Sequence, residues 1–376
     1  MSSRLLNSLP YEDGFHMPAE FEPQRAVWMI FASNGATWYN GCIPAQRAQV
    51  EMVKAINAAG TPVHIGVAPG LWLQAEQMLK GLDVTLYEMT SDDNWVRDTG
   101  AICVRNDATG EVRGVDFKFN AYGGEKHGAS MYYAVDDLIA RKMLQAEGLD
   151  RYRTSFILEG GSVICDGEGT AIVTESCLLN ENRNPEYDRE GIEKMLHDYL
   201  GFEKVIWLKS GVDNEEGETD GHVDDVCAFL APGEVVTCYT EDRENPYYEV
   251  FRDCYETLSH AVDAKGRGLT VHKLTAAAPF AFTEEEAENL LAAQGVGKEE
   301  DGHWRKAGEA AVPSYANFLI TNGSIIFPVY GLATDEEAVA CMERIAAGRF
   351  TVRPVPAHDI ALGGGSVHCT TQQIPR

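Results

Sequence analysis

Basic side chains and long apolar runs are both scarce in this sequence. Lys and Arg together number 31 against 58 Asp and Glu, which gives a formal net charge of −27. Such a charge repels nucleic-acid phosphates and anionic membranes, so we expect neither as a partner, and it attracts small cations. No run of about eighteen apolar residues occurs, and residues 1–10 do not resemble a signal peptide. We therefore expect a cytoplasmic protein.

Cysteine pairs, metal-binding spacings and linkers are absent as well. The nine cysteines form an odd set without a CxxC pair, and most lie within apolar stretches, which is typical of buried thiols. The ten histidines show no HExxH spacing, so we expect no metal site. Neither a Pro-, Ser- or Gly-rich linker nor a block of like charges divides the chain. The simplest interpretation is one domain spanning residues 1–376.

What the sequence does have is a repeated pattern of strand, tight turn, strand, amphipathic helix and strand. Turn signals such as Asn322-Gly323 separate the paired strands. Thr334 and Glu337 have the spacing of a capping box at the start of one of the helices. Four copies are continuous and cover residues 101–158, 162–208, 222–274 and 315–354.

The fifth copy is divided between the two ends of the chain. Its first strand is expected at 366–371, and its second strand, helix and closing strand at 26–31, 44–59 and 62–67. A unit completed by both termini closes a circle of repeats, so we expect an α/β fold of ββαβ units closed by the termini. An open α/β sheet is the alternative. Residues 280–312, rich in Glu and Gly, fit no unit, and we expect an insertion at the rim.

Residues with chemically active side chains lie near the start of the first strand in several units. Strands that begin around one axis would bring a thiol, an imidazole and three carboxylates together, and the glycines among them would let the backbone approach a ligand. The clusters are Trp95-Val96-Arg97-Asp98, Glu159-Gly160-Gly161, His222-Val223-Asp224 and the stretch from Gly363 through His368 to Cys369.

This set of groups suits the hydrolysis of a guanidinium. The central carbon of that cation is deactivated by delocalisation, so a strong nucleophile such as the Cys369 thiolate is needed. Carboxylates would hold the planar cation, and an imidazole, for which His222 is the candidate, would protonate the departing ammonia. His368 directly precedes Cys369, and neighbours along a strand point to opposite faces, so we assign His368 to packing.

Several stretches, taken together and in order, resemble the agmatine deiminases over nearly the whole chain. That family lies within the guanidine-modifying superfamily, whose fold is a five-fold pseudosymmetric α/β propeller (the pentein fold). The resemblance implies hydrolysis of agmatine to N-carbamoylputrescine and ammonia, in agmatine and polyamine catabolism, by a homo-oligomer (a dimer or higher) without metal or organic cofactor. The matching stretches are residues 13–18, 20–24, 95–98, 158–162, 221–224, 314–315 with 317–318, and 363–373.

The resemblance also implies a role for each matching catalytic residue. Cys369 would be the nucleophile that forms an amidino-cysteine intermediate. His222 would act as general acid and then as general base, with Glu159 as the carboxylate that orients it. Asp98 and Asp224 would clamp the guanidinium.

Two further residues match substrate-binding positions, and two depart from the family pattern. Glu218 stands where the family has an acid that contacts the substrate, and Trp95 would line the pocket. Asp220 stands where agmatine deiminases usually have Asn, and Tyr122 replaces a usual Trp. Both departures bear on which amine is the natural substrate, and neither alters the chemistry.

Other functions fit the residues less well. A deiminase of arginine or an amidinotransferase must pair the substrate's carboxylate with a cationic side chain, whereas the residues gathered here are acidic or aromatic. A deiminase of another small amino-guanidine remains open. A non-catalytic polyamine-binding protein would use carboxylates and aromatic rings and would need no thiol. A papain-like protease would have its cysteine near the start of the domain, whereas Cys369 lies near the end.

Overall fold

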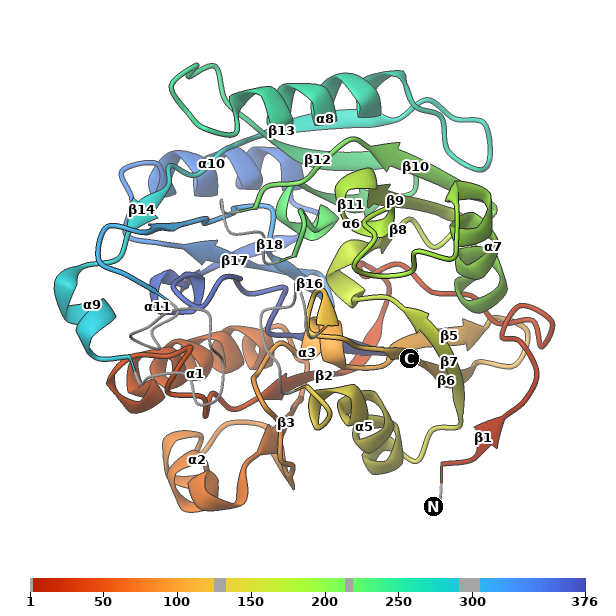
Figure 1. The fold of residues 1–376 in the computed structure, drawn as a ribbon. Coiled ribbons are helices and arrows are strands. Elements are labelled where there is room, and N and C mark those ends of the chain that lie inside the picture. The colour runs from red at the N-terminus through yellow and green to blue at the C-terminus, as the bar shows by residue number, and fades with distance from the viewer. Residues whose placement is uncertain (1–2, 125–132, 214–218, 291–304) are drawn as a thin grey trace.

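The computed structural model describes residues 3–124, 133–213, 219–290 and 305–376, and it is a mixed α/β fold. The longer helices lie toward the outside of the molecule and the strands lie inside (Figure 1). Across these described ranges, no helix is both long and apolar enough to cross a membrane.

The four continuous units have the predicted order of elements. In the first, β5 (Ile102–Asn106) pairs antiparallel with β6 (Glu111–Lys118), and helix α5 (Ile139–Glu147) leads to β7 (Arg151–Ile157), which is parallel to β6. A tight turn suffices between antiparallel strands, whereas parallel neighbours need a crossover helix.

The same order recurs in the next three units. The second comprises β8 (Ile164–Cys165), β9 (Thr170–Thr174), α6 (Glu175–Leu178), α7 (Arg189–Leu200) and β10 (Lys204–Leu208). The third comprises β11 (Cys227–Ala231), β12 (Glu234–Tyr239), α8 (Tyr248–His260) and β13 (Thr270–Thr275). The fourth comprises β16 (Leu319–Thr321), β17 (Ser324–Val329), α10 (Asp335–Ala346) and β18 (Thr351–Pro356).

The fifth unit is shared by the two ends of the chain, as predicted. Strand β19 (Gln372–Pro375) pairs antiparallel with β2 (Gln24–Ile30), and helix α1 (Ile43–Ala58) leads to β3 (Val63–Val67), which is parallel to β2. Beside the strands of this unit and of the first unit, three further elements occur that were not predicted. They are β1 (Leu5–Leu6) beside β7, helix α2 (Trp72–Met78), and β4 (Val84–Glu88) beside β3.

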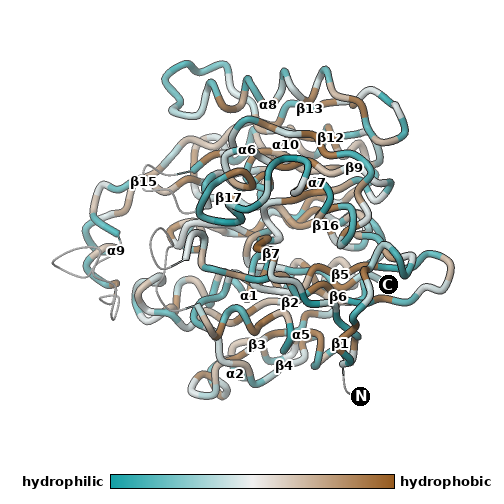
Figure 2. The backbone as a smooth tube through the Cα atoms, turned by 45° about the vertical axis from the view of Figure 1, so that its right-hand side comes forward, coloured by the Kyte–Doolittle hydropathy of each residue, from teal (hydrophilic) through white to brown (hydrophobic). Residues whose placement is uncertain are grey.

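Apolar side chains fill the space between each helix and its strands. Met52 and Ile56 of α1 cluster with Val27 and Ile65 of the strands that the helix covers. Burial of such a side chain contributes about 1.5–3 kcal/mol. Figure 2 shows the hydrophobic colours along the strands and the hydrophilic colours along the outer loops. The strands are therefore held in place from the outside, and their ends are available to position functional groups.

The described residues of the 280–312 segment, 280–290 and 305–312, lie outside the five units. Strands β14 (Phe280–Ala281) and β15 (Ala310–Ala311) pair with each other, and among the described residues neither joins another sheet. Helix α9 (Glu284–Glu288) lies between them. Phe282 of this segment packs against Leu362, just before the turn that carries Cys369.

The predicted capping box at the start of α10 is wrong. Thr334 makes no side-chain bond to the first turn, and its hydroxyl instead lies 2.9 Å from the hydroxyl of Tyr315. A tertiary hydrogen bond has displaced the local one here. A capping box does occur in α9, where Thr283 and Glu286 bond each other's backbone.

The expected strand starts at 222 and 366 also need correction. Strand β11 begins at Cys227 and β19 at Gln372, so the residues before them lie in turns. The cluster at 222 includes the short 3-10 helix Val223–Asp225. The clusters at 95–98 and 159–161 likewise lie before their strands, in helix α3 (Val96–Thr99) and the 3-10 helix Gly160–Ser162. Turn geometry, rather than alternation along a strand, therefore aims the candidate catalytic side chains.

Candidate active site

Cys369 is a buried thiol fixed by the amide of Asn317. The Asn317 side chain donates from Nδ2 to Cys369 Sγ (3.1 Å), and its oxygen accepts from the backbone N–H groups of His368 (3.0 Å) and Cys369 (3.2 Å). A Cβ on Gly365 would lie 2.9 Å from Cys369 Cβ and 2.6 Å from the ring of Trp95. Only glycine fits at that position, and because it has no side chain, the ring of Trp95 can pack beside the thiol.

The predicted imidazole and clamp carboxylates converge next to this thiol. A Cβ on Gly161 would lie 2.6 Å from His222 Nδ1 and 3.0 Å from an oxygen of both Asp98 and Asp224. The backbone N–H of Gly161 donates to Asp98 Oδ1 (2.9 Å), which fixes that carboxylate. Cys369 Sγ lies 3.8 Å from Asp224 Oδ2. Four of the predicted site residues thus share one small buried region.

Glu159 faces the imidazole and is held by an arginine that the sequence analysis missed. Glu159 Oε2 lies 4.0 Å from His222 Nε2, and its other oxygen accepts from Arg183 Nε (2.7 Å). The guanidinium of Arg183 is fully buried and also donates to Asp220 (2.5 Å) and to the carbonyl of Tyr122 (3.0 Å). The charge of Asp220 is therefore paired with Arg183, which the sequence alone did not suggest.

Several buried polar atoms of the site make no hydrogen bond with any described residue. They are Glu159 Oε2, both ring nitrogens of His222, and Asp224 Oδ1. Proteins rarely leave buried polar groups unpaired, because each costs about 1–3 kcal/mol. Atoms of this kind, facing a nucleophile, are suited to hold a substrate with several N–H groups.

The electrostatics of the site favour a cation over a free thiolate. Burial, followed by the charges of Asp224, Asp225 and Asp98, raises the pKa of Cys369 well above its usual value. Burial lowers the pKa of His222, but the carboxylate of Asp98 and other neighbours outweigh it and hold that pKa well above the usual value. The thiol is therefore protonated until a positive charge enters, and the imidazole carries a proton that it can deliver.

Tyr122, one of the two departures from the family pattern, bonds a clamp residue. Its hydroxyl donates to Asp98 Oδ2 (2.9 Å), and its ring meets that of His222 edge-on at 6.0 Å. Burial, with the adjacent Asp98 carboxylate, raises the pKa of Tyr122 well above its usual value. The hydroxyl thus remains a donor and orients Asp98.

We expect Tyr122→Phe to lower kcat/KM for the substrate by about tenfold to a hundredfold, because a hydrogen bond to a charged group contributes about 1.5–3 kcal/mol. Steady-state kinetics would measure the change. Tyr187→Phe is the matched control, since Tyr187 packs against Phe156 in a core cluster away from the site. Equal activity of Tyr122→Phe and the wild type would show that Asp98 needs no such donor.

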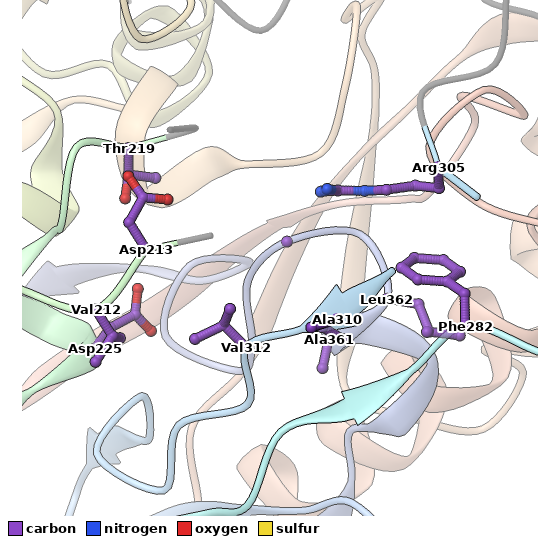
Figure 3. A pocket seen from close by; sticks show the side chains of 12 residues that line it. Val212, Asp213, Thr219, Asp225, Phe282, Arg305, Ala310, Val312, Ala361 and Leu362 are labelled. Carbon is purple, nitrogen blue, oxygen red and sulfur yellow. The ribbon is translucent and has the colours of Figure 1, made fainter. Parts of the chain in front are cut away.

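A pocket adjoins this region and is closed in part by the 280–312 segment. Asp213, Thr219 and Asp225 line one side, and Phe282 and Arg305 line the other. Figure 3 shows Arg305 reaching into the pocket across from Asp213. Arg305 also donates to Glu309 at 2.6 Å. The sequence analysis placed no cationic side chain here.

Two further predictions from the sequence concern Glu218 and His368. Glu218 lies outside the described residues. The assignment of His368 to packing is wrong, because its Nδ1 lies 2.7 Å from Asp224 Oδ2 and its Nε2 lies 2.7 Å from Glu20 Oε2. The assignment rested on strand alternation, and residues 366–371 form turns.

Two groups of side chains in the described part of the chain have the separations of metal ligands. One is Glu159, Cys177 and His222, and the other is Asp224, Asp225 and Cys369; the ligand atoms of each group lie within 4.8 Å of one another. Both groups draw on the thiol or the imidazole that the covalent chemistry needs. A reaction without metal therefore stays our prediction, and metal analysis of the purified protein tests it.

A buried thiol, an imidazole and carboxylates gathered at the strand ends of an α/β fold are the components of a hydrolase that attacks through cysteine. The model of the Porphyromonas-type peptidyl-arginine deiminase family matches residues 16–375, and the chain belongs to this family.

Individual relatives agree with this assignment. The agmatine deiminases of Ectopseudomonas mendocina and Pseudomonas putida are 45% and 44% identical to the chain, over 98% and 99% of its length and 98% of theirs. The structure of the agmatine deiminase of Enterococcus faecalis superposes with a TM-score of 0.92 at 42% identity and covers 100% of both chains.

Proposed function

We propose that the protein is an agmatine deiminase that hydrolyses agmatine to N-carbamoylputrescine and ammonia. The observation that carries the proposal is the convergence of Cys369, His222, Asp98 and Asp224 around one buried point. The unpaired carboxylate oxygens there, Glu159 Oε2 and Asp224 Oδ1, can accept from the N–H groups of a guanidinium. The whole-length similarity to agmatine deiminases supports the same substrate.

Binding places the planar cation between two carboxylates. Asp98, oriented by Tyr122 and by a backbone N–H, takes one side of the guanidinium, and Asp224 Oδ1 takes the other. Carboxylates bind such a cation through paired, charge-assisted hydrogen bonds. Trp95 packs beside the thiol and would line the aliphatic part of the pocket. We propose that Glu218 contacts the amine end of the substrate.

The first half-reaction begins when the bound cation offsets the carboxylates that raise the pKa of Cys369. The thiolate attacks the central carbon, a C–S bond forms, and the C–N bond to a terminal nitrogen breaks. His222 supplies the proton that this nitrogen needs to leave as ammonia. The thiol gives up its own proton to solvent as the cation binds, and the single proton from His222 leaves with the ammonia, so the products are ammonia, a neutral imidazole and a cationic amidino-cysteine.

Water completes the reaction in the second half. His222, now neutral, removes a proton from the water that attacks the amidino carbon, and the C–S bond breaks to release N-carbamoylputrescine and regenerate Cys369. Glu159 Oε2 lies 4.0 Å from His222 Nε2, so its charge favours a proton on that nitrogen and leaves Nδ1 for the reacting atoms. Arg183 holds Glu159 in that orientation through its bond to Oε1.

We propose further that residues 1–376 form one catalytic domain in which the five units close into a five-fold pseudosymmetric α/β propeller, with 280–312 as an insertion at the rim. The recurrence of the ββαβ order and the pairing of β19 with β2 support this arrangement. We also propose a cytoplasmic homo-oligomer, a dimer or higher, that has no nucleic-acid partner. The acidic composition and the free state of all nine cysteines are consistent with this.

Ammonia release from agmatine by the purified protein tests the proposed function. N-carbamoylputrescine should appear in equal amount, which mass spectrometry would show. Saturable binding of agmatine without ammonia release would instead indicate a polyamine-binding protein.

We expect agmatine to be preferred over arginine by about a thousandfold in kcat/KM, because arginine would have to bury a carboxylate near the like charge of Asp224. The cation of Arg305 is already paired with Glu309. Parallel assays with both substrates measure the preference, and Asp220→Asn should leave it unchanged. Comparable values would contradict the expectation and implicate Arg305 in carboxylate binding, in which case Arg305→Gln would abolish arginine turnover.

A further inference from the structure

His368 is a buried histidine with a carboxylate at each ring nitrogen. Its Nδ1 lies 2.7 Å from Asp224 Oδ2, and its Nε2 lies 2.7 Å from Glu20 Oε2. The ring cannot turn away from either partner easily, because Asn317 fixes the backbone N–H groups of both His368 and Cys369. His368 therefore links a clamp residue to Glu20, a residue from the opposite end of the sequence.

Two short contacts of this kind constrain the protonation of the ring. An ionised carboxylate can only accept, so both nitrogens of His368 must donate, and only the imidazolium has two N–H groups. Arg97 is the charged neighbour that opposes this state: its Nε donates to the His368 carbonyl (3.2 Å), and its Nη2 lies 3.3 Å from Glu20 Oε2. Burial and Arg97 lower the pKa of His368, but Glu20 and Asp224 outweigh them and the net shift is upward.

The imidazolium of His368 affects the ionisation and the orientation of Asp224. Burial raises the pKa of this carboxyl, but the hydrogen bond from His368, together with the positive charges of His368, His222 and Arg97, outweighs burial, and the pKa lies below its usual value. His368 also occupies Oδ2 and leaves Oδ1 as the buried oxygen without a partner among the described residues. The carboxylate is thus kept ionised, with one oxygen assigned to the protein and the other to the substrate.

We propose that His368 is a positioning residue, held as an imidazolium by Glu20, that fixes the ionised Asp224 with Oδ1 toward the guanidinium. The proposal deepens the function proposed above and rests on it. It assigns Glu20 and His368 a role in substrate recognition, although neither contacts the substrate.

The position of Glu20 and His368 bears on the pH dependence of the reaction. Glu20 and His368 line a cleft together with the clamp residue Asp224, and this cleft shares no lining residue with the pocket between Asp213 and Arg305. The cleft gives protons a route to His368 from the Glu20 side. A pH effect of His368 should appear in kcat as well as in kcat/KM, since kcat reports the titration of the enzyme–substrate complex.

Glu20→Gln is the decisive variant, with Glu22→Gln as its matched control. Glutamine keeps an oxygen for the Ile320 N–H that now bonds Glu20 (2.7 Å), but it removes the negative charge beside His368. Glu22 lies two residues away and pairs with Arg105 at 2.5 Å. Both substitutions therefore remove one paired acid from the same segment, and only one of these acids contacts His368.

The loss of the Glu20 charge lowers the pKa of His368, so the active form should disappear at lower pH than in the wild type. We expect the basic limbs of both kcat/KM and kcat to move down by about one pH unit or more, which is about a tenfold loss of each parameter above the shifted limb. Glu22→Gln should follow the wild-type profile. Identical profiles of the two variants would overturn the proposal.

A second measurement does not depend on activity. Nitrogen-15 spectra of histidine-labelled wild type, with the His368 signals assigned by their loss in His368→Gln, should show a doubly protonated ring at pH 7.5, where an unperturbed imidazole is mostly neutral. A neutral His368 ring at pH 7.5 would overturn the proposal even if Glu20→Gln failed to fold. A wild type that released no ammonia from agmatine would instead refute the proposed function, and the spectra would still test the imidazolium.

Discussion

Cys369→Ser is expected to lower kcat for agmatine hydrolysis by at least about a thousandfold, because a hydroxyl has a far higher pKa than a thiol and is a much weaker nucleophile. The fold should be unchanged, since serine is slightly smaller than cysteine and its oxygen can still accept from Asn317 Nδ2. Binding of agmatine should also persist, because Asp98 and Asp224 are untouched. The loss should therefore appear in kcat rather than in substrate affinity.

Ammonia release and the thermal midpoint of unfolding measure these two expectations. Cys341→Ser is the matched control: this thiol is also buried, donates to the Lys273 carbonyl (3.4 Å), and lies in α10 outside the site. In the wild type, rapid acid quenching during turnover should trap the amidino adduct on the peptide that contains Cys369. An adduct on another cysteine would refute the assignment of the nucleophile.

His222→Ala should lower kcat by roughly two to four orders of magnitude, because the same imidazole protonates the leaving ammonia and activates the water. Removal of the ring also takes away a positive charge that lies 4.0 Å from Glu159 Oε2 and 3.8 Å from Asp98 Oδ1. Both half-reactions should slow, so no burst of ammonia should precede steady turnover. Stopped-flow and steady-state assays would measure this.

His272→Ala serves as the control for that variant, since His272 pairs with Glu234 on the β13 side of the third unit. Glu159→Gln should act through the imidazole, and its effect should not add to that of His222→Ala in the double variant. Near-normal kcat of His222→Ala would show that another group is the acid, and the proposed mechanism would then be wrong.

Much of the fold could be predicted because its signals are local. The helix of the second unit is an example, since a polar residue, Asp188, caps α7 and a glycine, Gly201, ends it in the left-handed conformation. The turn between β16 and β17 was predicted from Asn322-Gly323, and both residues have positive φ values of 40° and 78°. Such signals need no knowledge of the rest of the chain.

The site could be predicted only in part, because its geometry depends on contacts between distant segments. Glycines and acidic residues near strand starts indicated where the chemistry gathers. Arg183 and Asn317 gave no such signal, since their roles follow from bonds to residues 24 and 52 positions away. His368 was misassigned for a related reason: its bond to Glu20 spans 348 positions, and the local pattern suggested a strand.

The pairing of β19 with β2 has a consequence for biosynthesis. Strand β19 and the Cys369 turn follow every other strand in the described chain, yet they complete the sheet that begins with β2 near the N-terminus. Domains fold as the chain is synthesised, N-terminal parts first, but this sheet cannot be completed until translation has passed residue 375. Cys369 is thus the last of the catalytic residues to be synthesised. A nascent chain on the ribosome contains the acids and the imidazole of the site before it contains the thiol, so the protein can become active only after synthesis of the C-terminal segment.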